Sequence, residues 1–142
     1  MVSQNLTLSQ QLKVSYCTTC RGRLHHLRQT LPKNLEAEKD NPNVEFVILS
    51  YGSDPELDTY MKENYQAEID SGKIKYAVYP EAKNFRMAHA KNMAHRLASG
   101  EIVCNLDADN YLGKNYAKWL SDHFLQNPNS IVTVVPASLG KQ

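Results

Sequence analysis

Apolar residues recur along this chain at two alternating spacings, one typical of helices and the other of strands. Leu24, Leu27, Leu31 and Leu35 lie three or four residues apart, so a helix would place them on one stripe. Pro32 falls inside this stretch and predicts the end of the helix close by. Apolar stripes of the same kind predict four helices in all, over residues 24–35, 55–69, 84–99 and 114–126.

Short apolar runs between these stretches predict strands. Residues 44–49 and 102–106 have the length and the β-branched content of buried strands. Residues 73–79 alternate between two faces, which favours an edge strand. Weaker runs at 12–16 and 131–135 predict a first and a fifth strand. Because strands alternate with helices, we expect an α/β fold, a three-layer sandwich around a mostly parallel sheet with right-handed crossovers.

Length and composition agree with one soluble domain. The chain has 142 residues, of which 42% are apolar, and no linker or repeat interrupts the pattern. Sixteen basic and fifteen acidic residues leave a net charge of +1, so no overall field would recruit nucleic acid or a membrane surface. We find neither a membrane span of about 20 apolar residues nor a signal peptide, and we expect a cytoplasmic protein. Residues 1–11 and 137–142 are expected to be flexible tails.

Two carboxylates, Asp107 and Asp109, follow the strand predicted over residues 102–106. Carboxylates are costly to bury within a sheet, but at the carboxyl end of a parallel strand they reach the crevice where such sheets bind ligands. Two hard oxygen donors can hold a divalent cation that takes its other ligands from water and phosphate. The alternative interpretation is a solvated loop in which Asp109 or Asn110 caps the next helix.

Further polar residues are expected at the same edge of the sheet. Thr18 and Thr19 follow the first predicted strand, and residues 50–53 follow the second. Because parallel strand ends meet at one edge, these residues and Asp107 are predicted to share a cleft. Lys91, in the third predicted helix, is either a cation that reaches a diphosphate or an ordinary solvated lysine. The two commonest nucleotide-binding fingerprints, both rich in glycine, are absent.

Cys17 and Cys20 form a Cys-x-x-Cys motif that the pattern places in a turn before a helix. Thioredoxin-like oxidoreductases have this arrangement, in which the helix N-terminus lowers the pKa of the first thiol. A zinc site would need further ligands, and His25 and His26 face different ways on a helix. Two small side chains in a turn are the third interpretation. The odd number of cysteines, three, argues against a disulfide framework.

Three segments in the second half of the chain carry motifs that belong together. They are Asn-Phe-Arg-Met-Ala-His-Ala-Lys-Asn at 84–92, Ala-Ser-Gly-Glu-Ile at 98–102 and Leu-Asp-Ala-Asp-Asn at 106–110. At this spacing they resemble the nucleotide-sugar-binding half of family 2 glycosyltransferases, which have the GT-A fold. That family typically reads Asn-x-Gly-x-x-x-Ala-Arg-Asn, Ala-x-Gly-Glu and Asp-x-Asp. The resemblance covers residues 12–135.

The resemblance implies a truncated or minimal GT-A domain that binds a nucleoside-diphosphate sugar, with a UDP-sugar favoured, and transfers the sugar to an unknown acceptor. Asp109, with help from Asp107, would bind Mn²⁺ or Mg²⁺ at the donor diphosphate. Thr18 and Thr19 would line the nucleoside pocket. The implied donor-binding residues are Thr18, Thr19, Ser53, Lys91 and Asp107.

Several positions depart from the family pattern. Ser50 and Tyr51 replace an acidic pair that contacts the base in relatives, and Arg86 replaces a glycine. Lys91 brings a point charge where the family has the bidentate fork of an arginine. The family's enzymes are also longer, and in inverting members the catalytic base lies in the later half, so the catalytic residue stays unknown. Two alternatives remain open, a thioredoxin-like oxidoreductase and a non-catalytic nucleotide- or metal-binding module.

Overall fold

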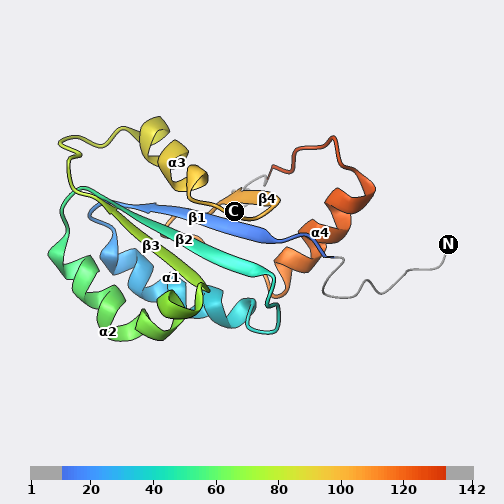
Figure 1. Cartoon of the computed structure of the whole chain (residues 1–142), viewed down its shortest axis with the longest axis horizontal. Helices are drawn as coiled ribbons and strands as arrows, with labels where there is room; N and C mark the ends of the chain where they lie inside the picture. The colour runs from blue at the N-terminus through green and yellow to red at the C-terminus, as the bar shows by residue number, and fades with distance from the viewer. Residues whose placement is uncertain (1–10, 134–142) are drawn as a thin grey trace, which may run out of the picture.

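A sheet of parallel strands forms the centre of the protein (Figure 1). The structure is a computed structural model and describes residues 11–133. Within them the strand order is β3-β2-β1-β4, and all neighbouring strands run parallel, so the carboxyl ends of the strands meet at one edge, as expected. The strands are β1 (Val14–Cys20), β2 (Val44–Tyr51), β3 (Ile74–Tyr79) and β4 (Ile102–Asn105).

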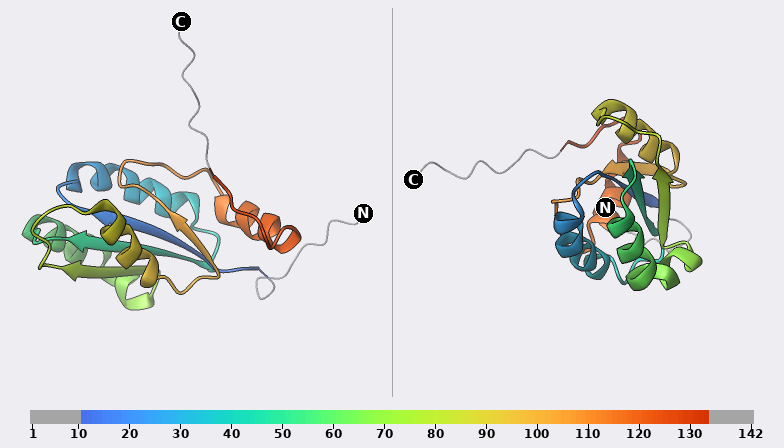
Figure 2. Two further views of the ribbon diagram at one scale, coloured as in Figure 1. Left: turned by 90° about the horizontal axis from the view of Figure 1, so that it is seen from above. Right: turned by 90° about the vertical axis from the view of Figure 1, so that its left-hand side faces the viewer.

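Helices cover both faces of this sheet, which confirms the three-layer α/β architecture (Figure 2). One face packs against α1 (Leu24–Ala37), α2 (Pro55–Ser71) and α4 (Tyr116–Gln126). The other face packs against α3 (Met87–Arg96). None of the helices within residues 11–133 is long and apolar enough to cross a membrane.

The central strands are buried on both faces because both faces carry helices. In β1, Tyr16 points into the larger apolar cluster with α1 and α2, while Cys17 points toward α3. The α3 face presents Ala90 and Ala94, both fully buried, and these small side chains let the helix lie close to the sheet. On the other face, the buried Glu38 carboxylate accepts a hydrogen bond of 3.1 Å from the Ala117 amide and so attaches α4 to the end of α1.

A buried polar network attaches the start of β4 to the two central strands. The Glu45 carboxylate accepts hydrogen bonds from the Ser15 hydroxyl at 2.7 Å, the Ser99 amide at 2.7 Å and the Ser99 hydroxyl at 2.8 Å. The Ser15 hydroxyl in turn accepts the Gly100 amide at 2.8 Å. Lys13 forms an ion pair with Glu45 at 3.4 Å. The carboxylate is almost fully buried but has enough partners to remain charged.

The structure corrects several predicted boundaries. The strand predicted over 12–16 is β1, and it extends to Cys20 because each of its residues pairs with a residue of β2, ending with Cys20 opposite Ser50. The predicted turn over residues 17–20 is therefore wrong. Pro32 does not end the first helix, which continues to Ala37 although the proline has no N–H to donate to the carbonyl four residues before it.

The third helix is shorter than its predicted range of 84–99, beginning at Met87 and ending at Arg96. The fifth strand predicted over 131–135 is not formed by residues 131–133, which have no regular structure. Residues 134 and 135 lie outside the described range, and so do the predicted tails apart from Gln11.

Candidate functional site

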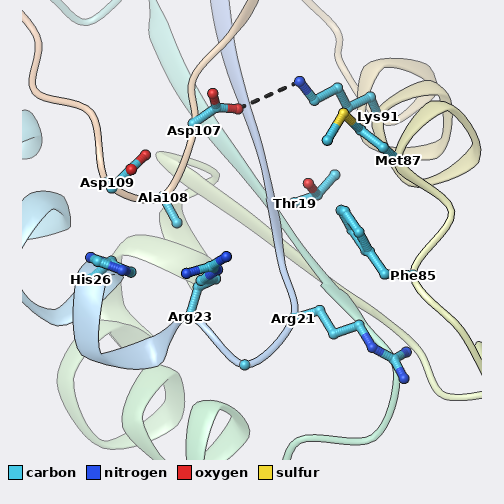
Figure 3. A pocket seen from close by; sticks show the side chains of 11 residues that line it. Thr19, Arg21, Arg23, His26, Phe85, Met87, Lys91, Asp107, Ala108 and Asp109 are labelled. Carbon is cyan, nitrogen blue, oxygen red and sulfur yellow. Dashed lines mark ion pairs between the residues drawn. The ribbon is translucent and has the colours of Figure 1, made fainter.

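A cavity of about 590 Å³ lies at the carboxyl edge of the sheet, between the start of α1 and the start of α3 (Figure 3). This is the edge at which open α/β sheets bind ligands. Its lining combines Thr19 of β1 with residues of both helices and of the loop that follows β4. The lining residues are Thr19, Arg21, Gly22, Arg23, His26, Phe85, Met87, Lys91, Asp107, Ala108 and Asp109.

Lys91 and Asp107 meet on one wall of this cavity. The Lys91 Nζ lies 3.6 Å from the Asp107 Oδ1, and the two side chains are 33% and 50% exposed. The Asn105 side-chain amide donates a hydrogen bond of 3.0 Å to the same Asp107 oxygen. An ion pair this open contributes at most about 1 kcal/mol to stability, so these groups remain available to a ligand.

Asp109 lies beside this pair and also lines the cavity (Figure 3). The Asn110 amide donates to the Asp107 carbonyl at 3.0 Å, which closes a turn around the buried Ala108. That turn leaves both aspartate side chains exposed. Neither Asp109 nor Asn110 caps a helix, because α4 begins later, with Asn115 at its N-cap position. The helix-cap interpretation of the aspartates is therefore wrong.

Buried hydroxyl and amide groups hold the backbone of this aspartate loop. The Thr18 hydroxyl donates a hydrogen bond to the Leu106 carbonyl at 2.6 Å, and the Thr30 hydroxyl donates to the Ala108 carbonyl at 2.7 Å. The Asn34 side chain binds the loop twice, through the Asn110 carbonyl at 3.0 Å and the Leu112 amide at 2.8 Å. The sequence reasoning missed Thr30 and Asn34. Their signal is that they are polar residues on the otherwise apolar stripe of a helix.

The remaining predicted donor residues lie at different depths. Thr19 lines the cavity, whereas Thr18 is buried below it with its hydroxyl engaged by the Leu106 carbonyl. Ser53 is exposed after β2 and is not part of the lining.

Tyr51 is almost fully buried, and its hydroxyl lies 2.7 Å from the His89 Nδ1. The sequence reasoning did not assign Arg21, Arg23, His26, Phe85 and Met87 to this site.

The two cysteines of the Cys-x-x-Cys motif lie on opposite faces of the sheet. Cys17 and Cys20 are fully buried, belong to apolar clusters on opposite faces of the sheet and are both free thiols. Burial raises the pKa of Cys17 to about 12 and the pKa of Cys20 to about 11. Thiol–disulfide exchange needs an accessible thiolate, which these environments disfavour. The structure therefore argues against the thioredoxin-like alternative.

A divalent cation would have to take part of its coordination from a ligand. Residues 11–133 hold no cluster of three or more histidine, cysteine, aspartate or glutamate side chains that could bind a metal. Asp107 and Asp109 offer carboxylate oxygens to an open cavity, however, and Mg²⁺-type sites of one or two carboxylates completed by water and phosphate are common. The donor set fits a cation that binds together with an anionic ligand.

The family model of glycosyl transferase family 2 matches residues 15–140, which is most of the chain. This chain belongs to glycosyl transferase family 2. A search of curated proteins gives no match to this family 2 chain.

Solved structures show the GT-A-like fold. TarS 1–349 from S. aureus in complex with UDP has a TM-score of 0.66 at 20% identity, over 92% of this chain and 40% of that one. The mannosyltransferase PcManGT from Pyrobaculum calidifontis, in complex with GDP-Man and Mn²⁺, has a TM-score of 0.62 at 23% identity, over 79% of this chain and 33% of that one. The chain thus spans 40% or less of the length of these two solved proteins.

Proposed function

We propose that the cavity between α1 and α3 binds a nucleoside-diphosphate sugar and that the protein serves transfer of the sugar to an acceptor. The observation that carries this proposal is the contact between Lys91 and Asp107 beside Asp109, at the ligand-binding edge of a family 2 sheet. The complexes of TarS with UDP and of PcManGT with GDP-Man and Mn²⁺ support this class of ligand. In this reading, residues 1–142 form one nucleotide-sugar-binding domain.

Within the proposed site, Asp107 and Asp109 would hold Mn²⁺ or Mg²⁺. The cation, when bound, neutralises charge on the leaving diphosphate as a Lewis acid. Lys91 supplies a compact positive charge on the same wall, where it can bind a phosphate oxygen once Asp107 turns to the cation. Thr19 lines the nucleoside side of the cavity, and Thr18 supports the loop from below. We assign no catalytic base within residues 11–133.

Calorimetric titration with UDP, with and without Mn²⁺, tests this site. The diphosphate would supply oxygen ligands to the cation, so each should raise the affinity of the protein for the other by the same factor. Asp109→Asn removes one carboxylate from an exposed position and should abolish this coupling while the fold stays intact. Asp40→Asn, which changes an exposed aspartate outside the cavity lining, is the matched control and should keep the coupling.

Two results would contradict the proposal. Equal affinity of the unaltered protein for UDP in excess chelator and in Mn²⁺ would exclude the cation bridge. If the unaltered protein binds neither UDP nor, in a parallel titration, GDP, with or without Mn²⁺, the proposed nucleotide site is excluded altogether. Circular dichroism of Asp109→Asn distinguishes loss of binding from loss of fold.

A further inference from the structure

The Arg21 guanidinium lies at the cavity but is directed at a backbone loop (Figure 3). Its Nη1 donates to the Ala82 carbonyl at 3.1 Å and to the Tyr51 carbonyl at 3.4 Å, and its Nη2 donates to the Lys83 carbonyl at 2.9 Å. These hydrogen bonds join the end of β1 to the end of β2 and to the loop of residues 80–86, which connects β3 to α3. Figure 3 shows the guanidinium turned away from both aspartates.

Gly52 makes room for this arrangement. A Cβ atom at Gly52 would lie 2.8 Å from the Arg21 Nη1, closer than side chains tolerate, and the glycine has a φ of +110°. A residue with a side chain would be strained in that conformation and would also displace the guanidinium. The absence of a side chain at Gly52 therefore leaves room for the Arg21 guanidinium.

The loop that Arg21 holds carries Phe85, whose ring lines the cavity near Thr19 (Figure 3). Phe85 is 47% exposed and lines the cavity, so part of its apolar ring is open to a ligand there. Behind it, the Tyr51 ring makes an edge-on contact with a centroid distance of 5.9 Å and an interplanar angle of 84°. Because Tyr51 is buried and hydrogen-bonded to His89, it gives Phe85 a fixed support.

We propose that Phe85 is the surface on which the nucleobase of the donor stacks, and that Arg21 is the positioning residue that holds this surface in place. The inference rests on the proposed nucleotide-sugar site and deepens it. An aromatic ring with an open face binds the flat face of a base, and such stacking tolerates different bases. The guanidinium of Arg21 acts through the loop backbone and not on the phosphates, which face Lys91 and the aspartates.

Comparing UDP with pyrophosphate separates this role from direct phosphate binding. Both ligands are titrated calorimetrically in Mg²⁺ into the unaltered protein, Arg21→Ala, Phe85→Ala and the double variant. Each single variant should weaken UDP binding by roughly tenfold, the effect of losing one stacked base, and leave pyrophosphate binding within about twofold. The double variant should be weaker by less than the product of the two effects, because both changes remove the same contact.

Arg28→Ala is the matched control, because Arg28 is a cation of α1 that lies over the Tyr60 ring and not in the cavity lining. It should bind both ligands like the unaltered protein. Hydrogen exchange gives a second measurement. The Gly52 amide donates to the Tyr79 carbonyl at 2.8 Å and should exchange faster in Arg21→Ala than in Phe85→Ala, because only the first variant frees the neighbouring Tyr51 and Ala82 carbonyls.

Three outcomes would overturn the inference. An equal loss of pyrophosphate and UDP affinity in Arg21→Ala would make Arg21 a phosphate ligand. Unchanged UDP affinity in either single variant would remove the stacking role. Equal affinity of the unaltered protein for pyrophosphate and UDP would show that the nucleoside adds no net affinity. If the unaltered protein binds neither ligand, the proposed function itself fails, and this inference fails with it.

Discussion

The Thr30 hydroxyl of α1 donates a hydrogen bond of 2.7 Å to the backbone carbonyl of Ala108, the residue between the two aspartates of the site. Both residues are buried, so water does not compete for this bond. Asn34, one turn further along α1, holds the Asn110 carbonyl of the same loop. The position of Asp107 and Asp109 is thus set by α1 as well as by β4.

Thr30→Val tests this support with a side chain of nearly the same shape. It should lower the free energy of unfolding by about 1–3 kcal/mol, because the buried Ala108 carbonyl loses its partner. Mn²⁺-dependent UDP binding should also weaken, since the aspartate loop is less well held. Urea unfolding and calorimetry measure the two effects. Thr59→Val, at an exposed threonine of α2, should change neither quantity. If Thr30→Val also leaves both the free energy of unfolding and the UDP affinity unchanged, Thr30 does not support the loop.

Lys91→Ala should weaken UDP binding by roughly ten- to a hundredfold, because a charge-assisted hydrogen bond to a phosphate is worth roughly 1.5–3 kcal/mol. Lys91→Arg should retain most of the affinity, since it keeps the charge. Stability should change by less than about 1 kcal/mol in either variant, because the ion pair with Asp107 is open to solvent. Calorimetry and urea unfolding check both statements. Equal affinity in Lys91→Ala and in an exposed control, Lys118→Ala, would remove Lys91 from the site.

Gly100→Ala should destabilise the protein by about 1–3 kcal/mol through overpacking. The added Cβ would lie 2.6 Å from the Ser15 Oγ and 2.8 Å from the Lys13 carbonyl, where the start of β4 meets β1. Gly113→Ala is the matched control, because its Cβ would meet nothing within 4 Å. The melting temperatures of the two variants should differ clearly, with Gly100→Ala the lower. Equal melting temperatures would show that the backbone at Gly100 relaxes freely.

Glu45 should make stability fall at acid pH. Burial alone would raise the pKa of Glu45, but hydrogen bonds from Ser99 and Ser15, with the charge of Lys13, outweigh it and hold the pKa at about 2. The folded pKa lies below the unfolded value of 4.5, so the stabilisation is present above pH 4.5 and is lost as the pH falls toward 2. Its size is on the order of 3 kcal/mol.

Urea unfolding between pH 6 and pH 3 measures this effect, and Glu45→Gln should remove much of the pH dependence. Glu63→Gln, at an exposed position of α2, should leave the dependence unchanged. If Glu45→Gln and the unaltered protein lose stability in parallel, other carboxylates account for the loss.

The thiols of Cys17 and Cys20 should resist alkylation in the folded protein at pH 8. Both are fully buried, and their pKa values are raised to about 12 and about 11, so almost no thiolate is exposed to a reagent. Mass spectrometry after iodoacetamide treatment should find both unmodified in buffer and modified in urea. Rapid labelling of Cys17 or Cys20 in buffer would show that the strand opens and would revive a redox role.

The sequence by itself determined the order and type of the four helices and four strands within residues 11–133, although not all their bounds, because each depends on apolar spacing within a short segment. That order also determined where the site lies. Helices alternating with parallel strands bring all strand ends to one edge, so Asp107 after β4 and Thr19 at the end of β1 face the same cavity. The motifs at 84–92 and 106–110 likewise predicted that Lys91 and Asp107 belong to one site, and the two side chains are in contact.

Only the tertiary structure decided which polar side chains form hydrogen bonds with the backbone of distant segments and which face the cavity. Residues 17–20 look like a turn in isolation, but pairing with β2 makes them a strand and buries both cysteines. The partners of Thr30 and Arg21 lie 78 and 61 residues away in the chain, at the Ala108 and Ala82 carbonyls. No local pattern specifies such contacts, because they depend on where the sheet places two distant backbone segments.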